Sequence, residues 1–148
     1  MLHTLPMPAQ WLIRLSIAAV WIYEGLWCKL LGRLPSQLAI VEEVPRFTAG
    51  FANRLLRLLG IAEVLLALWV LSGIASPLCA VAQIAFLIVL NGNGLLWARK
   101  LIHDPAGMVI KNIAFLILVW INGAWVNGIW INGVWINGAS PAKIWLVK

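Results

Sequence analysis

Four long apolar runs, separated by short polar segments, set the pattern of this chain. They cover approximately residues 11–31, 54–74, 77–97 and 108 to beyond 120. About 20 apolar residues are enough for one helical crossing of a bilayer. A transmembrane barrel would instead show segments of about ten residues with alternating polarity, and the chain has none. The pattern therefore predicts an all-α fold, a four-helix transmembrane bundle.

The composition excludes a soluble domain. The chain has 148 residues, of which 63% are hydrophobic and 11% charged, whereas soluble domains average about 45–50% and 25%. A soluble domain of this length buries only about 70% of its surface, so lipid must cover the remaining apolar area. The net charge of +6 favours contact with anionic lipid headgroups. Nucleic acid is not an expected partner, because the basic residues are scattered near the ends of the runs.

The C-terminal part repeats a five-residue unit, Trp-Ile/Val-Asn-Gly-X, starting at Trp120, Trp125, Trp130 and Trp135. We therefore divide the chain into a four-span domain, 1–119, and a low-complexity repeat tail, 120–148. A five-residue period spirals around a helix and alternates between the faces of a strand. The uncharged stretch 112–142 would span about 45 Å as a helix, against a hydrocarbon core of about 30 Å. We expect the first copies to finish span four and the last to lie among the headgroups.

Two acidic residues interrupt the apolar runs, Glu63 in the second and Glu24 in the first. A charged side chain at the middle of a bilayer costs about 2.5–3.5 kcal/mol, so it is rare without a partner or a function. Gly60 and Ala67 share a helical face with Glu63 and permit close helix approach. Glu63 should therefore point into the bundle. Lys29 lies five residues after Glu24, off its helical face, so a partner on another helix is expected.

Six polar residues of the runs lie in the same half of the membrane when their depth is counted at about 1.5 Å per residue, and the opposite half has no acidic residue. The predicted intramembrane site consists of Glu24, Lys29, Glu63, Asn91, Lys111 and Asn112. It should open toward loops one (32–53) and three (99–107). Two alternatives stay open: Lys29 and Lys111 extend to the interface, or Glu63 only joins two helices.

Two glycine-containing motifs bear on the third and fourth spans. Asn91-Gly-Asn-Gly is either an unwound segment that lines a cavity or the end of the third span at Leu90. Asp104, Pro105 and Gly107 form a predicted structural turn that starts the fourth helix.

Few residues suit catalysis. His103 stands alone, so no metal site is predicted. Cys28 and Cys79 are far apart in the sequence and lie in apolar runs, as expected of inert buried thiols. The chain has no nucleophile–base motif or glycine-rich nucleotide loop, so an autonomous enzyme is not expected.

Lys and Arg are distributed unequally between the two predicted sides. Eight lie near loops one and three, against three on the other side: Lys29, Arg33, Arg46, Arg54, Arg57, Arg99, Lys100 and Lys111, against Arg14, Lys143 and Lys148. The positive-inside rule then places loops one and three in the cytoplasm.

Three segments together resemble the DoxX-like family of small four-helix bacterial membrane proteins. They are Trp21-Ile-Tyr-Glu-Gly-Leu-Trp-Cys-Lys-Leu, Leu59-Gly-Ile-Ala-Glu-Val-Leu and Asp104-Pro-Ala-Gly-Met-Val-Ile-Lys-Asn. The polar positions that recur in the family fall on Glu24, Gly25, Lys29, Gly60, Glu63, Asp104, Pro105, Lys111 and Asn112. Members are named after a subunit of a thiosulfate:quinone oxidoreductase, and others accompany redox proteins. Members fused to nicotinamide-dependent domains imply a cytoplasmic N-terminus, opposite to the charge count.

The resemblance implies an accessory or anchor subunit of the cell inner membrane, linked to quinone or thiol redox metabolism through a redox protein partner. No resident cofactor is expected, and a quinone is the ligand left open. The alternatives are a small proton-coupled transporter, in which the acids titrate, and a structural membrane scaffold. The sequence does not indicate an oligomeric state.

Overall fold

The computed structural model describes residues 7–124, 128–131 and 134–137. In these residues, four helical segments are long and apolar enough to cross a membrane: Pro8–Leu30, Ala49–Ser72, Ser76–Trp97 and Pro105–Ala124. The predicted all-α four-helix transmembrane bundle is confirmed, and the chain is a multi-pass membrane protein.

The first membrane span changes its helix type before it ends. It consists of the α-helix α1 (Met7–Ile22) and the π-helix η1 (Tyr23–Leu30). The other elements are α2 (Pro35–Glu42), α3 (Ala49–Ser72), α4 (Ser76–Trp97), the 3₁₀-helix η2 (Arg99–Leu101), α5 (Pro105–Ala124), β1 (Gly128–Ile131) and β2 (Val134–Asn137). The sequence prediction missed α2, because it treated residues 32–53 as a loop. Pro35 begins this helix, at a position where proline is favoured.

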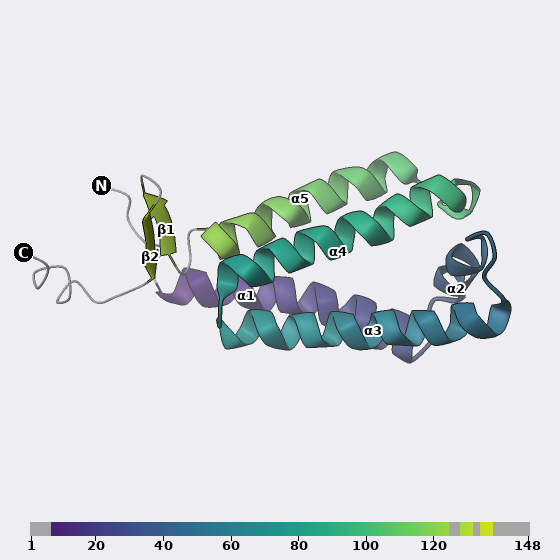
Figure 1. The fold of residues 1–148 in the computed structure, drawn as a ribbon, viewed down its shortest axis with the longest axis horizontal. Coiled ribbons are helices and arrows are strands. Elements are labelled where there is room, and N and C mark those ends of the chain that lie inside the picture. Colours follow the sequence, from purple (N-terminus) through teal and green to yellow (C-terminus); the bar gives the residue numbers. More distant parts are fainter. Residues whose placement is uncertain (1–6, 125–127, 132–133, 138–148) are drawn as a thin grey trace, which may run out of the picture.

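The helices diverge from one end of the bundle to the other. A tight turn joins α3 to α4, with Gly73 in the left-handed region at φ 67°. At the opposite end α3 and α4 separate, and α2 lies between them (Figure 1). There α2 contacts α3, α4 and η2. The bundle is therefore narrow at the Gly73 turn and wide at the end that carries loops one and three, called the loop end below.

The hydrophobic core consists of eight buried residues from four spans: Ile17, Ala18, Trp21, Ala67, Val70, Cys79, Ala80 and Val119. The Trp21 ring packs edge-on against Phe86 and Phe115, at centroid distances of 5.9 and 5.6 Å. Trp21 also donates a hydrogen bond of 2.7 Å from its Nε1 to Oε1 of buried Gln83. These contacts fix the indole ring between α1, α4 and α5.

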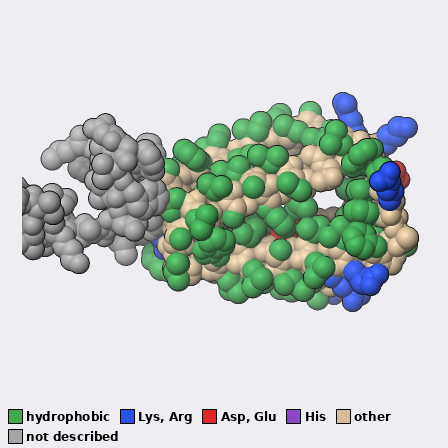
Figure 2. Space-filling view, in the orientation of Figure 1, with side chains coloured by type: hydrophobic (Ala, Val, Ile, Leu, Met, Phe, Trp, Pro, Cys, Tyr) green, Lys and Arg blue, Asp and Glu red, His purple; other side chains and the backbone are tan. Residues whose placement is uncertain are grey.

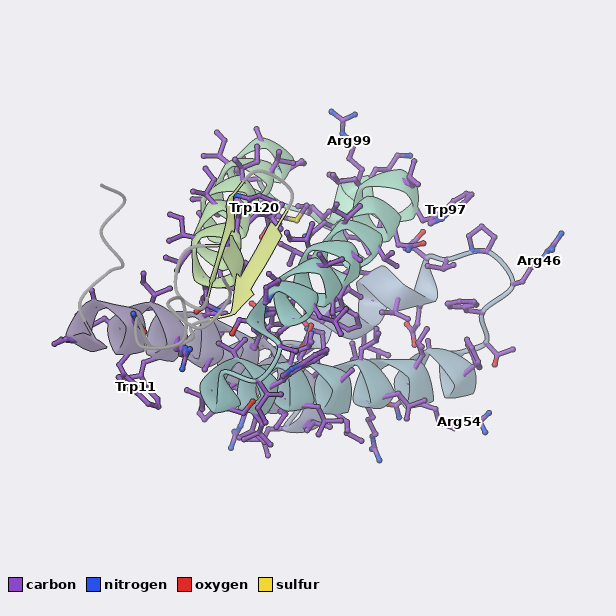
Figure 3. The ribbon with its side chains drawn as sticks, turned by 60° about the vertical axis from the view of Figure 1, so that its left-hand side comes forward. Trp11, Arg46, Arg54, Trp97, Arg99 and Trp120 are labelled. Carbon is purple, nitrogen blue, oxygen red and sulfur yellow. The ribbon has the colours of Figure 1, made fainter. Side chains whose placement is uncertain are left out.

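The outer surface fits a bilayer. Apolar side chains cover the side of the bundle, whereas Lys and Arg gather at the loop end (Figure 2). Trp97 lies near that end with Arg46 and Arg54, and Trp11 and Trp120 lie toward the other (Figure 3). The three tryptophans are 50%, 47% and 58% exposed. Because tryptophan favours the membrane–water interface, they mark the two edges of the apolar belt.

The third span passes through the Asn-Gly pairs without a break. Helix α4 continues to Trp97, so the interpretation that this span ends at Leu90 is wrong. Asn91 donates from Nδ2 to the carbonyl of Leu87 at 2.9 Å, and Asn93 donates in the same way to Val89 at 2.8 Å. Each carboxamide thus bonds the preceding turn of its own helix, and no unwound segment forms.

The first repeat copy belongs to the fourth span, because α5 ends at Ala124. Strands β1 and β2 pair antiparallel, with Trp130 opposite Trp135. Residues 125–127, 132–133 and 138–148 lie outside the described residues. The expected position of the last copies among the headgroups therefore stays a prediction.

Candidate functional site

A cavity of about 470 Å³ lies between the spans, toward the loop end. It lies on the loop side of Trp21 and Phe115, which form part of its wall. All six residues of the predicted intramembrane site line it: Glu24, Lys29, Glu63, Asn91, Lys111 and Asn112. The rest of the wall is mainly aliphatic, so the polar groups are few and converge on one space.

A buried ion pair is the main electrostatic feature of the wall. Lys29 Nζ lies 2.7 Å from Glu63 Oε2, and the two side chains are 8% and 2% exposed. The expected partner of Lys29 on another helix is thus Glu63. The alternative in which Lys29 extends to the interface is wrong, because its ammonium group is held inside the bundle.

The π-helix η1 corrects one sequence inference, that Glu24 and Lys29 do not share a helix face. Five residues advance an α-helix by one turn plus about 140°, whereas a π-helix closes its hydrogen bonds between residues five apart. Lys29 Nζ therefore lies 3.6 Å from Glu24 Oε2 and 3.4 Å from the Glu24 carbonyl. Lys29 faces two carboxylates, one on its own span and one on α3.

Two glycines allow this arrangement. A Cβ atom on Gly25 would lie 2.6 Å from the carbonyl oxygen of Gly60, and one on Gly60 would lie 2.8 Å from that of Gly25. No side chain fits between η1 and α3 at this crossing. The close approach of the two backbones brings Glu63 within reach of Lys29.

Gln37 is a wall residue that sequence reasoning missed. From α2, its Nε2 donates a hydrogen bond of 2.8 Å to Glu24 Oε2, and the residue lines the cavity. The carboxylate only accepts hydrogen bonds, which sets the orientation of the amide. The helix-start signal of Pro35 could have revealed α2 and its only side-chain amide.

The remaining predicted residues occupy α4, α5 and the turn between η2 and α5. Asn91 and Asn112 are partly buried in the cavity wall, whereas Lys111 is largely exposed. Asp104 Oδ1 accepts a hydrogen bond of 2.9 Å from the Gly107 amide, and Pro105 is the first residue of α5. In the described part of the chain, no three His, Cys, Asp or Glu residues are grouped to hold a metal ion.

A second polar group lies deeper in the bundle. Besides accepting from Trp21, buried Gln83 donates from Nε2 to the Cys79 carbonyl at 3.2 Å and to its Sγ at 3.3 Å. Gln83 carries no charge and belongs to no Asn-Gly pair, so neither sequence signal marked it as a site residue. This chain of hydrogen bonds leads from the cavity wall into the half of the bundle that has no acidic residue.

Fold and cavity together define a class: a small four-span membrane protein with a charged pair in a mainly apolar intramembrane cavity. The chain belongs to the DoxX-like family, whose match covers residues 18–120. This range includes the three segments on which the sequence resemblance rests. Searches of curated proteins and of solved structures give no match.

Proposed function

We propose that the protein is an accessory subunit of the bacterial inner membrane that binds the head of a quinone-class lipid and serves a redox protein partner. The Lys29–Glu63 ion pair carries this proposal, because it places buried charged groups in the wall of a mainly apolar cavity. Buried charges inside membranes usually mark sites of ligand or ion handling. The family resemblance supports the link to redox metabolism.

The chemistry of the wall suits a quinone ring. The ring offers an apolar plane with two carbonyl acceptors, and its reduced form offers two hydroxyl donors. Lys29, Lys111 and Asn112 supply donors, and Glu24 and Glu63 supply acceptors. The cavity volume of about 470 Å³ falls in the range of about 300–1,000 Å³ that is usual for small-molecule sites.

A variant that removes both charges tests the proposal in the purified protein. Replacing a buried ion pair by apolar residues is often neutral or stabilising by about 1–4 kcal/mol, whereas removing one partner costs about 3–5 kcal/mol. We therefore expect Lys29→Met/Glu63→Met to fold with an unchanged or higher Tm. The second carboxylate beside Lys29 does not oppose this, because Glu24 is partly exposed and keeps its hydrogen bond from Gln37. The probe is a tail-less dimethoxy-methyl-benzoquinone, which should raise the Tm of the wild type and of the exposed control Glu43→Gln only.

Two results would oppose the proposal. If the probe raises the Tm of the double variant as much as that of the wild type, the ion pair does not bind the quinone. If it changes neither Tm, the quinone proposal fails, and the ion pair only joins η1 to α3.

A proton-coupled transporter is the second candidate, and the Trp21–Gln83–Cys79 chain favours it. These groups extend polar contacts from the cavity toward the opposite membrane surface. In proteoliposomes with a pH gradient, Glu63→Gln should abolish pH-dependent flux and Gln83→Leu should reduce it. Equal flux in wild type and Glu63→Gln would exclude this function.

A further inference from the structure

The cavity has an opening through the side of the bundle. Figure 2 shows a hollow between α3 and α4, close to the basic loop end. Leu59 of α3 and Leu90 of α4 line the cavity, and both side chains are only partly buried. Since both helices are membrane spans, this hollow faces the hydrocarbon of the bilayer.

The loop end, by contrast, is covered. A Cβ atom on Gly94 would lie 3.8 Å from Ile40 Cγ2 of α2 and 3.7 Å from Ile102 Cδ1. These aliphatic side chains and Val41 form the wall at this end. The hydrogen bond between Gln37 and Glu24 ties α2 down over η1. A ligand that came from water would have to displace α2, whereas one that came from lipid would not.

The two ends of the space differ in chemistry as well. Its inner part holds the Lys29–Glu63 pair, whereas Leu59 and Leu90 offer only aliphatic surface at the side. A ligand that satisfies both needs a polar head and a flexible apolar chain. If the ligand consisted of a head group alone, lipid would have to fill the opening in the side of the bundle.

We propose that the opening between Leu59 and Leu90 is the entrance of the cavity and that it holds the apolar tail of the quinone, which enters sideways from the bilayer. This inference rests on the proposed function and adds the ligand class: a head with one long alkyl or isoprenoid tail. The tail leaves between α3 and α4 while the head lies at Lys29 and Glu63. Helix α2 keeps its position over the loop end while the ligand binds.

A bulky residue in the opening tests whether the opening holds the tail. The protein in lipid nanodiscs is titrated with the tail-less benzoquinone and with its decyl derivative. Wild type should bind the decyl derivative at least tenfold more tightly. Leu90→Trp should weaken decyl binding at least tenfold and tail-less binding less than twofold. Leu96→Trp, on the same helix but 76% exposed, should change neither Kd by more than twofold.

The outcomes separate the two proposals. If neither probe binds to the wild type, the proposed function fails. If both bind but Leu90→Trp weakens their binding equally, or weakens neither, the tail does not lie in the opening and the inference is wrong.

A nitroxide label at Leu90→Cys gives a measurement that needs no ligand. It should collide often with oxygen, which concentrates in lipid, and rarely with a water-soluble nickel chelate. The reverse pattern would show that the opening faces water and would overturn the inference. Frequent collisions with oxygen, combined with equal binding of the two probes, would show that a phospholipid chain fills the opening, which also overturns it.

Discussion

At the scale of single residues, the site depends on two glycines, which have no side chain, as much as on its charged residues. The carboxylate of Glu63 reaches Lys29 because Gly25 and Gly60 have no side chains to separate their helices. Small residues at helix crossings compensate for the weak drive of apolar side chains to associate in lipid. The position of the ion pair is thus set by Gly25 and Gly60, which have no functional group of their own in the site.

A methyl group at this crossing should disturb the protein measurably. Gly60→Ala places a Cβ 2.8 Å from the Gly25 carbonyl and 3.0 Å from Lys29 Cβ, so η1 and α3 must move apart. Overpacking of this kind costs about 1–3 kcal/mol. We expect the free energy of unfolding, measured by denaturant titration in mild detergent, to fall by this amount.

Gly92→Ala is the matched control, because a Cβ there meets nothing within 4 Å. Removing a helix-interior glycine should stabilise α4 by roughly 0.5–1 kcal/mol. Equal effects of the two substitutions would mean that the crossing of η1 and α3 tolerates a side chain.

At the scale of elements, apolar run length was enough to predict the four spans, but not their local departures from regular structure. The relation of Glu24 to Lys29 was missed because α-helical spacing was assumed, and five-residue spacing becomes one face only in a π-helix. Gln37 was missed because α2 lies in a segment too short to stand out by periodicity. Gly92 and Gly94 suggested a break in α4, but side-chain hydrogen bonds from Asn91 and Asn93 accompany an unbroken helix.

The turn before α5 was predictable because its signal is local, and it can be tested locally. Asp104 accepts the Gly107 amide at the start of the helix, and Asp and Asn are about equally good in this position. Asp104→Ala should lower the free energy of unfolding by about 1 kcal/mol, and Asp104→Asn should keep most of it. Denaturant titrations of both variants provide the measurement. If Asp104→Asn lowered the free energy of unfolding as much as Asp104→Ala, the charge of Asp104 and not its hydrogen bond would stabilise the helix start.

At the scale of the whole molecule, the bundle has one basic end and one nearly uncharged end. Arg46, Arg54 and Arg99 lie at the loop end (Figure 3), whereas the Gly73 turn at the other end lies against the guanidinium of Arg14. The six polar positions predicted from depth alone all line one cavity toward the basic end. The depth of the site residues along their spans was predictable because helices rise regularly. The contribution of α2 and η2 to the cavity wall could be seen only in the tertiary structure.

The charge asymmetry makes a prediction for topology. Single cysteines at Arg46 and Arg99 should react with a membrane-impermeant maleimide from the same side, and a cysteine at Ile74 from the other. By the positive-inside rule, the first two should react only in inverted membrane vesicles. Labelling of the first two in intact spheroplasts would reverse the orientation and agree instead with the cytoplasmic N-terminus that the resemblance implies.

The contact between Lys29 and Glu24 within the first span has a consequence for membrane insertion, because the spans are synthesised one after another. Ribosomes make Lys29 before Glu63, so the first span must enter the lipid while its later partner is still unmade. An unpaired lysine at this position, one residue before the end of the span Pro8–Leu30, would oppose that entry by less than the roughly 2.5–3.5 kcal/mol of a helix centre. Glu24, already present on the same π-helical face, can neutralise it at this stage. We therefore expect the nascent first span to carry its own temporary counter-charge until the second span, with Glu63, arrives.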